Sequence, residues 1–555
     1  MEWSLGRLKF LLCGIAVGLG LVHTWLGLAA VHGMDGVSYL DMGDAYMRSD
    51  WDTAINGLWN PLYAVMAGAA LHVVKPSPRW EFPFIHLLGF AIYIVALICF
   101  DFLWAELAEV RRKEERSSTG EASAGFPDWA WLLIGYCLFL WVSLHVIRVV
   151  EESPDMLVAA LVYLASALML RISTGGARTG TFILLGLVLG VGYLAKAVMF
   201  PLSFVFLVVA AFVVLRQKQA LVRPLVAFVV FLVMASPLIL ALSRTKGRLT
   251  FSDSGKINYL WHVDGVPWMY WQGNFPGSGA PTHPPRQILT NPVIFEFAKP
   301  FAATYPPWYD PSYWYDGMKP HFNLKKEMGA LSEAAATYYS LFFRPGAALI
   351  AISLTLLFLG RSFRDLARRL DLLIPTVAGM GMYALIHVEP RYVGSFILVF
   401  WGAVLCQLRL PDSYHSRRLF VCATLSIVII YSAALAFGTL SAAASEGVLS
   451  ARYQANFKVA ESIRWAGLGS ADPVASIGSH TGTTWARLAR VRIVADMPDG
   501  ADFWLEGPDA QSKVLSAFQT SGAKAVVAEA TSQPVSMDGW SRVGKTNFYL
   551  YIFRK

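Results

Sequence analysis

The stretch GMDGVSYLDMGDAYMRSDWDTAINGLWNPLYAVMAGAAL, from Gly33 to Leu71, follows directly after the first apolar segment of the chain. It combines an apolar framework, suited to lying against a membrane, with five carboxylates: Asp35, Asp41, Asp44, Asp50 and Asp52. Ionisable side chains at a membrane edge are costly unless they are solvated or paired, so they are functional candidates by default. The question is then whether the segment before this stretch spans a membrane.

The composition answers that question. Of the 555 residues, 55% are hydrophobic and only 15% are charged, and the mean hydropathy is +0.48. A soluble chain has about a quarter of its residues charged, so this chain lacks polar surface. Apolar runs of about 15 to 23 residues recur, near the length that crosses a hydrocarbon core of about 30 Å. We therefore predict a polytopic α-helical membrane protein.

The net charge of +8 does not indicate a nucleic-acid-binding protein. The basic residues fall mainly in alternate short loops, and the sequence has no basic domain with interleaved aromatic residues that could follow a phosphate backbone. These residues fit better as signals that orient the chain in the membrane. No nucleic acid partner is expected.

Eleven apolar segments are predicted to span the membrane. They lie at about 10–31, 83–103, 129–149, 154–170, 180–195, 197–215, 224–243, 346–360, 372–388, 393–408 and 419–440. The first is kept as an uncleaved span because its apolar run is long for a signal peptide. Basic loops such as 111–116, 216–223 and 361–369 then share the side of the N-terminus, as the positive-inside rule requires. The N-terminus is predicted to be cytoplasmic and the C-terminus extracytoplasmic.

This topology places the opening stretch, the loop 244–345 and the tail 441–555 on the outer face. The loop 244–345 is rich in Trp, Tyr and Pro, which favours a belt at the membrane interface, with stacking on sugar rings as the alternative. In the tail, DPVASIGS, AKAVVAEA and FYLYIFRK have the pattern of strands, and ANFKVAESIRWAG and DAQSKVLSAFQTSG that of helices. We predict a transmembrane domain of about 11 helices over 1–440 and a small C-terminal extracytoplasmic α/β domain over 441–555.

Two acidic segments on the outer face are candidate sites. Asp50 and Asp52 fit helix caps, whereas Asp35, where the first span ends, is equally open to a structural and a functional interpretation. In EESPD, Asp155 suits the first turn of the next helix, where a carboxylate meets the positive end of the helix dipole. Glu151 and Glu152 have no such role. With Asp155, they are candidates for binding an acceptor hydroxyl or a divalent ion.

Two cations on predicted outer turns are further candidates. Lys196 interrupts the apolar stretch GVGYLAKAVMFPLSF, where it either reaches to lipid headgroups or provides a fixed charge for a buried phosphate. The motif HVEPRY offers the same choice. Arg391 is either neutralised by Glu389, or it holds phosphate oxygens together with Tyr392.

Nucleotide and metal motifs are absent from the sequence. There is no P-loop, no G-x-G-x-x-G after a strand, and no zinc-binding helix motif. The histidines of the outer segments lack metal-ligand spacing. The sequence predicts no definite cofactor, and a divalent metal ion held by distant loops stays an alternative.

Taken together, these motifs resemble the GT-C superfamily of integral-membrane glycosyltransferases, above all the bacterial aminoarabinose (lipid A) transferases and the protein O-mannosyltransferases. MDGVSY is similar to the family's Asp-Glu-x-x-Tyr, and NGLWNPLY to its Asn…Lys-Pro-Pro-Leu stretch. YLAKAVMFP is similar to its Lys-Gly-Pro turn, and EPRY to a recurrent late outer-loop motif. The predicted membrane topology matches the family over roughly residues 1–440.

The resemblance implies an activity. It is the transfer of a hexose or pentose, with inversion, from a polyprenyl-phosphate-linked donor to a lipid, glycan or protein acceptor. The reaction would take place at the extracytoplasmic face of a bacterial inner (plasma) membrane. Asp35 would be the catalytic base, and Lys196, Arg391 and Tyr392 would hold the donor phosphate. The carboxylates at 151–155 would position the acceptor or a metal ion.

Two other classes of protein stay open. A transporter or flippase for a polar lipid would also use charges in the membrane and a cation for phosphate. Such proteins usually show internal repeats and broken helices at the midplane, and no repeat is evident here. The third class is a non-catalytic sugar-binding membrane subunit, with the tail as its functional part.

Overall fold

The computed structural model describes residues 5–116, 123–175, 178–297, 299–360, 362–478, 482–505, 507–530 and 538–553. Arg361 of a predicted basic loop, and Ser479 and residues 554–555 of the predicted strand segments, lie outside these ranges. The chain divides into two compact units of three segments each. The first unit comprises Met1–Leu26, Gly89–Phe251 and Asn323–Ala443, and the second comprises Gly27–Leu88, Ser252–Phe322 and Ala444–Lys555. The division at residue 440 expected from the sequence stays a prediction.

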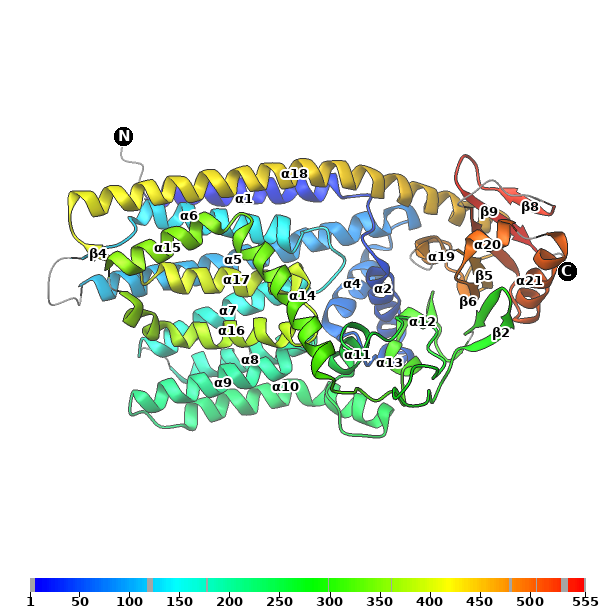
Figure 1. Cartoon of the computed structure of the whole chain (residues 1–555), viewed down its shortest axis with the longest axis horizontal. Coiled ribbons are helices and arrows are strands. Elements are labelled where there is room, and N and C mark those ends of the chain that lie inside the picture. Colours follow the sequence, from blue (N-terminus) through cyan, green and yellow to red (C-terminus); the bar gives the residue numbers. More distant parts are fainter. Residues whose placement is uncertain are drawn as a thin grey trace. The chain divides into compact units, whose positions relative to one another are not determined.

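The first unit is a bundle of helices built from the apolar segments (Figure 1). Its helices are α1 (Leu5–Leu26), α5 (Glu81–Arg116), α6 (Asp128–Leu140), α7 (Asp155–Ser173), α8 (Thr179–Ala195), α9 (Met199–Arg216), α10 (Val222–Lys246), α14 (Leu324–Phe343), α15 (Ala347–Gly360), α16 (Leu370–Ala384), α17 (Pro390–Leu405) and α18 (Tyr414–Trp465). A π-helical turn, Trp141–Val146, extends α6. Strands β1 (Ser123–Ala124) and β4 (Leu410–Pro411) pair with each other in a short antiparallel sheet. Helices α5 and α18 have residues in both units.

Each of the eleven predicted spans overlaps a helix of this set. Among the described residues, seven helices are long and apolar enough to cross a membrane, and the bent pair α14–α15 could form an eighth span. Helices α8 and α17 are apolar but shorter. The chain is therefore a multi-pass membrane protein, as its composition predicts, while the count of eleven crossings and their direction stay predictions.

Close packing in the bundle depends on small residues. Helices α8, α9 and α10 lie side by side (Figure 1). A Cβ atom added to Gly186 would lie 2.3 Å from the carbonyl oxygen of Ala227, and one added to Gly190 would lie 2.4 Å from the Met234 Cβ. Apolar helices in lipid gain no hydrophobic drive from pairing, so such close backbone approach supplies the packing energy instead. The spacing of Gly186 and Gly190 is a G-x-x-x-G motif.

The second unit contains the stretch with the five aspartates, the aromatic loop and the tail. Its helices are α2 (Met34–Met47), α3 (Trp51–Ala54), α4 (Pro61–Val74), α11 (Ser254–His262), α12 (Pro306–Tyr309), α13 (Pro311–Trp314), α19 (Thr484–Ala489), α20 (Gly500–Leu505) and α21 (Pro508–Thr520). Helices α2 and α4 approach closely because Gly43 and Gly68 face one another, and a Cβ on Gly43 would lie 2.6 Å from the Ala64 carbonyl oxygen.

A seven-stranded mixed sheet forms the other half of this unit. Its strands are β2 (Arg286–Thr290), β3 (Val293–Glu296), β5 (Pro473–Ile477), β6 (Arg492–Met497), β7 (Ala525–Glu529), β8 (Trp540–Arg542) and β9 (Phe548–Ile552). They lie in the order β2-β3-β6-β5-β7-β9-β8, with β5 parallel to β6 and β7 and the other pairs antiparallel. The predicted strands of the tail are confirmed as β5, β7 and β9, and the predicted helices as α21 and the end of α18. The hairpin β2–β3 comes from the aromatic loop, which the sequence did not predict to join the sheet.

Candidate functional site

The first candidate cluster lies in the helical unit, around a buried carboxylate. Helix α8 ends at Ala195, and Lys196 follows in an extended conformation. Its Nζ lies 2.5 Å from Oδ1 of Asp155, the first residue of α7. The Asp155 side chain is only 3% exposed, and the Ser153 hydroxyl donates to its Oδ2 at 2.9 Å. This carboxylate is therefore positioned by a cation and a hydroxyl.

A second cation converges on the same carboxylate. Arg391 lies in the first turn of α17, where Pro390 starts the helix with its fixed φ. Its Nε lies 3.6 Å from Oδ2 of Asp155, and its Nη1 donates to Oε1 of Glu151 at 2.9 Å. Arg391 therefore contacts carboxylates of the 151–155 segment, and its pairing with Glu389, one of the two sequence alternatives, stays a prediction. Asp155 thus lies between the two cations.

Tyrosine rings complete this cluster. The Lys196 Nζ lies 3.4 Å from the centroid of the Tyr392 ring and 5.8 Å from that of Tyr383. The two rings are stacked, with centroids 5.2 Å apart. A cation over a desolvated ring is attracted by the ring quadrupole, so the tyrosines fix the direction of the ammonium group. The structure thus brings together five of the residues singled out in the sequence: Lys196, Arg391, Tyr392, Asp155 and Glu151.

The second candidate cluster lies in the other unit, around Asp35. This residue occupies the first turn of α2, and Trp308 of α12 donates from its indole Nε1 to Oδ1 of Asp35 at 3.2 Å. The Ser38 hydroxyl in turn donates to the carbonyl oxygen of Trp308 at 3.3 Å. An aspartate in a first turn is also stabilised by the helix dipole. The hydrogen bond from Trp308 therefore orients the Asp35 carboxylate, in addition to the stabilisation that the helix dipole gives.

Three of the other four aspartates of the opening stretch have structural partners. The Asp50 side chain accepts a hydrogen bond from the Thr53 backbone N–H at 3.3 Å, which confirms its predicted role as a helix cap. Asp52 is exposed on α3. Asp41 and Asp44 both pair with Arg487, a residue of the tail that the sequence analysis did not single out.

Aromatic residues of the loop surround the tryptophan that contacts Asp35. The rings of Trp261 and Trp308 are stacked, with centroids 5.5 Å apart and planes 8° apart. Trp268 packs on the same ring at 6.3 Å and is 54% exposed. Trp308 is nearly buried, which no local sequence signal indicates, because Trp is equally common at membrane interfaces.

Histidine and carboxylate donors also occur in the second unit. The His32 Nε2 lies 3.0 Å from both carboxylate oxygens of Glu446, and the rings of His32 and His86 have centroids 6.1 Å apart. Imidazole and carboxylate are donors that zinc accepts. Glu152, a predicted acceptor or metal-site candidate of the first unit, is buried at 4% exposure. Metal binding stays a prediction.

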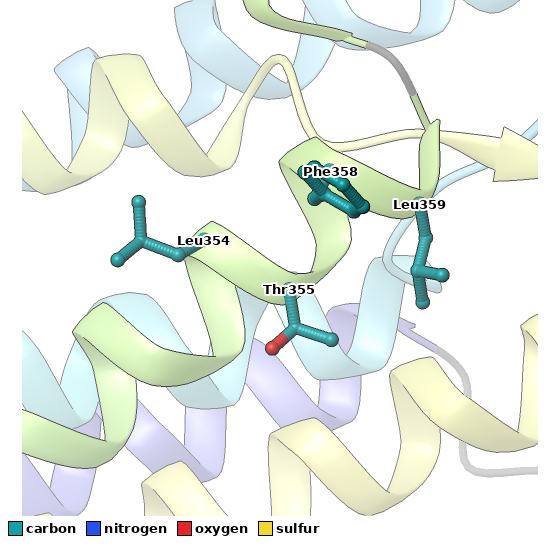
Figure 2. A pocket seen from close by; sticks show the side chains of 4 residues that line it. All are labelled: Leu354, Thr355, Phe358 and Leu359. Carbon is teal, nitrogen blue, oxygen red and sulfur yellow. The ribbon is translucent and has the colours of Figure 1, made fainter.

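A further groove is chemically unlike either cluster. It is an apolar hollow of about 400 Å³ on α15, lined by Leu354, Thr355, Phe358 and Leu359 (Figure 2). Phe358 is 76% exposed, and the single hydroxyl of Thr355 is its one polar side-chain group. A lining of this kind suits a hydrocarbon chain and offers no acid, base or phosphate ligand.

Comparison with known proteins identifies the architecture. No protein-family model and no curated protein sequence matches the chain. A solved structure of ArnT from Cupriavidus metallidurans, bound to undecaprenyl phosphate, matches with a TM-score of 0.51 at 12% identity, covering 97% of each chain. The same protein in the apo state matches with a TM-score of 0.50 at 13% identity, covering 97% of this chain and 96% of that one. The chain has the fold of the GT-C glycosyltransferases.

A second GT-C structure agrees. The Archaeoglobus fulgidus oligosaccharyltransferase in complex with Zn and sulfate matches with a TM-score of 0.50 at 12% identity, over 94% of this chain and 68% of that one. The GT-C resemblance inferred from short motifs is thus confirmed at the level of the fold, including the C-terminal sheet region. At 12–13% identity the likeness concerns the fold, and the activity is argued from the residues of this chain.

Proposed function

We propose that the chain is a membrane glycosyltransferase that moves a sugar from a polyprenyl-phosphate-linked donor to a lipid, glycan or protein acceptor on the extracytoplasmic face. The observation that carries the proposal is the convergence of Lys196 and Arg391 on one buried carboxylate. Two cations held on one carboxylate, both over the ring of Tyr392, are the groups that a phosphate leaving group needs. The GT-C fold, shared with a protein solved with bound undecaprenyl phosphate, supports the same donor class.

The ion pairs of the first cluster support a phosphate site that is organised in advance. Asp155 and Glu151 balance the charges of Lys196 and Arg391 while no phosphate is present. Donors fixed in this way need no reorganisation when negative charge develops, which is how such groups stabilise a transition state. Arginine provides a planar fork for phosphate oxygens, and lysine provides a compact point charge.

The proposed reaction is a displacement at the anomeric carbon. The bond from that carbon to the phosphate oxygen breaks, and a bond to the acceptor oxygen forms on the opposite face, which inverts the configuration. Lys196 and Arg391 stabilise the negative charge on the departing polyprenyl phosphate. Asp35, oriented by Trp308, accepts the proton of the attacking hydroxyl.

The carboxylates at 151–155 take supporting roles in this proposal. Asp155 holds the two cations in place, and Glu151 fixes the guanidinium of Arg391. Glu152 and the other two stay candidates for positioning the acceptor or a divalent metal ion. Membrane lipids surround the helical unit, and the proposal includes no nucleic acid partner.

The test is a donor panel with purified full-length protein. Polyprenyl-phosphate sugars with labelled sugars are supplied with a membrane extract as acceptor, and release of polyprenyl phosphate is measured. Wild type is compared with Asp35→Asn and with the matched control Asp52→Asn, an exposed carboxylate of the same stretch. We expect turnover by wild type and the control, and none by Asp35→Asn.

The other outcomes separate the alternatives. Equal turnover by Asp35→Asn would move the catalytic base to the 151–155 segment. Movement of labelled lipid between leaflets of a vesicle, without release of polyprenyl phosphate, would identify a transporter or flippase. Donor binding by the folded protein without either activity would identify a non-catalytic sugar-binding subunit.

A further inference from the structure

A buried arginine of the tail lies against the helix that carries Asp35. Arg487 belongs to the short helix α19, which follows β5, and its side chain is 3% exposed. Its Nη1 donates to Oδ1 of Asp41 at 2.8 Å and to Oδ2 of Asp44 at 2.6 Å. Its Nε donates to Oε1 of Glu81, at the start of α5, at 2.7 Å. One guanidinium thus joins three acidic side chains of two helices.

The arginine is needed because these carboxylates are close together and two of them, Asp41 and Glu81, are buried. Glu81 is 1% exposed, and Asp41 and Asp44 are neighbours on α2, three positions apart. Like charges at that spacing repel each other. Burial opposes the charge on Arg487, but Glu81, Asp44 and Asp41 outweigh it and raise the pKa of Arg487 well above its ordinary value. Arg490 also pairs with Glu81, with its Nη2 2.7 Å from Oε2. Removing Arg487 would therefore act mainly on Asp41, a buried acid that would lose the cation paired with it, which is a destabilising change.

The same cluster reaches the residue that orients Asp35. Asp41 accepts two hydrogen bonds from Thr304, one from its backbone N–H at 2.7 Å and one from its hydroxyl at 2.9 Å. The carbonyl oxygen of Thr304 accepts from the backbone N–H of Ile493 in β6 at 3.0 Å. Thr304 lies four positions before Trp308, whose indole donates to Asp35. Helix α2 is therefore held at Asp35 through Trp308 and at Asp41 through Thr304 and Arg487.

The distance along the helix is short. Asp35 and Asp41 are six residues apart on α2, which is about 9 Å at 1.5 Å per residue. A tilt of the helix at Asp41 would therefore move the carboxylate of Asp35 relative to Trp308. Misplacement of a reacting group by about 1 Å can cost about 10²-fold in rate.

We propose that Arg487 is a positioning residue, through which the C-terminal domain fixes α2 and the Thr304–Trp308 segment and so sets the orientation of Asp35. The inference rests on the proposed function, and it gives the C-terminal domain a part in the reaction. Arg487 acts through Asp41 and Thr304, and it does not itself contact the reacting atoms.

The experiment compares full-length Arg487→Lys and Arg487→Met with Arg492→Met. Arg492 is a matched control, because it lies in the adjoining strand and its side chain donates to the Ala471 carbonyl oxygen. We expect kcat for donor turnover to fall by about 10²-fold in Arg487→Met, less in Arg487→Lys, and not in the control, with donor KM within about twofold. Arg487→Lys should keep more of the wild-type kcat than Arg487→Met, but not all of it, because lysine has the charge and lacks the planar fork of arginine.

Hydrogen exchange measured by mass spectrometry gives a readout that does not depend on activity. We expect faster exchange in α2 and in residues 303–309, with β5, β6 and β7 unchanged. Uniformly faster exchange across the second unit in Arg487→Lys, or an unchanged kcat in either folded variant, would overturn the inference. If Arg487→Met does not fold, Arg487→Lys decides. Absence of turnover by wild type would instead contradict the proposed function, and the exchange measurement would still test the connection to α2.

Discussion

The indole nitrogen of Trp308 donates a hydrogen bond of 3.2 Å to Oδ1 of Asp35, across 273 positions of sequence. This contact joins the aromatic loop to the helix that follows the first apolar segment. The ring of Trp308 is itself stacked on the ring of Trp261, and this stacking fixes the direction in which the indole N–H points. The carboxylate therefore has an orientation that is set by residues far away in the chain.

Replacing Trp308 by phenylalanine tests the value of that hydrogen bond. The change keeps an aromatic ring and removes the indole N–H, so Asp35 loses an orienting donor. Hydrogen bonds to charged groups contribute about 1.5–3 kcal/mol, and we expect kcat to fall by about tenfold or more. The control is Trp51→Phe, at an exposed tryptophan of the same unit. Steady-state kinetics decide, and a kcat equal to that of the control would show that the contact does not orient the base.

The ion pair between Lys196 and Asp155 predicts different results for single and double variants. Lys196→Met leaves the buried Asp155 with Arg391 as its remaining cation among the described residues, and breaking such a pair costs about 3–5 kcal/mol. Lys196→Met combined with Asp155→Asn removes both charges, so most of the thermal stability should return. Donor turnover should stay low in both, because the phosphate has lost a cation. Full activity of the double variant would exclude Lys196 from the donor site.

A buried acid in the C-terminal sheet predicts a dependence of stability on pH. The hydroxyls of Tyr270 and Tyr305 donate to Oδ2 of Asp496 at 2.6 and 2.7 Å, while its buried Oδ1 has no partner among the described residues. Burial raises the pKa of Asp496 to about 7, although the two hydroxyls lower it in part. Between its ordinary value and about 7, the folded state holds a proton that the unfolded state has lost.

The free energy of unfolding should therefore fall as pH rises from about 4 to about 7, and change no further from this source above that range. Thermal unfolding of the detergent-solubilised protein at pH 5 and pH 8 measures the effect. Asp496→Asn should reduce the difference between the two melting temperatures. Asp472→Asn is the matched control, because the hydrogen bond from Lys524 lowers the pKa of Asp472 and its titration lies below this window. An undiminished difference in Asp496→Asn would assign the dependence to other groups.

The close backbone approach of α2 to α4 gives a fourth prediction. A methyl group at Gly43 would meet the carbonyl oxygen of Ala64 at 2.6 Å and the Cα of Gly68 at 2.9 Å, and neither atom can move without its helix. Gly43→Ala should separate α2 from α4, destabilise the protein by about 1–3 kcal/mol, and reduce turnover by displacing Asp35. Gly255→Ala, where the added methyl group meets nothing within 4 Å, should be neutral. Melting temperature and kcat of the two variants test this directly.

The sequence predicted the elements that depend on local pattern. Hydrophobic runs gave the helices of the bundle, and alternation in segments such as 473–477 gave strands of the tail sheet. Asp50 was correctly placed as a helix cap because its spacing to Thr53 is local. Asp35, Lys196 and Arg391 were selected because a charge at a membrane edge is costly unless it is solvated or paired. That argument does not identify the residue with which the charge pairs.

Contacts between distant segments could not be predicted. Arg487 lies 446 positions from Asp41, and its own segment, TTWARLAR, carries no signal that separates a buried arginine from an exposed one. The same holds for Asp496 between two tyrosines of the aromatic loop. The pairing of Lys196 with Asp155 could have been predicted, because the predicted topology placed both residues on the outer face. The distance between the two side chains could not.

The hairpin β2–β3 has a consequence for how the protein is made. Phe295 of β3 pairs with Asp496 of β6, roughly 200 residues later in the chain. At a synthesis rate of about 5–20 residues per second, β3 waits roughly 10 to 40 s for its neighbour strand. During that interval its backbone is an open edge that can pair with other chains. Biogenesis of this protein thus includes a period in which an incomplete sheet needs protection. In a chain that ends before β6, the edge of β3 would stay unpaired permanently.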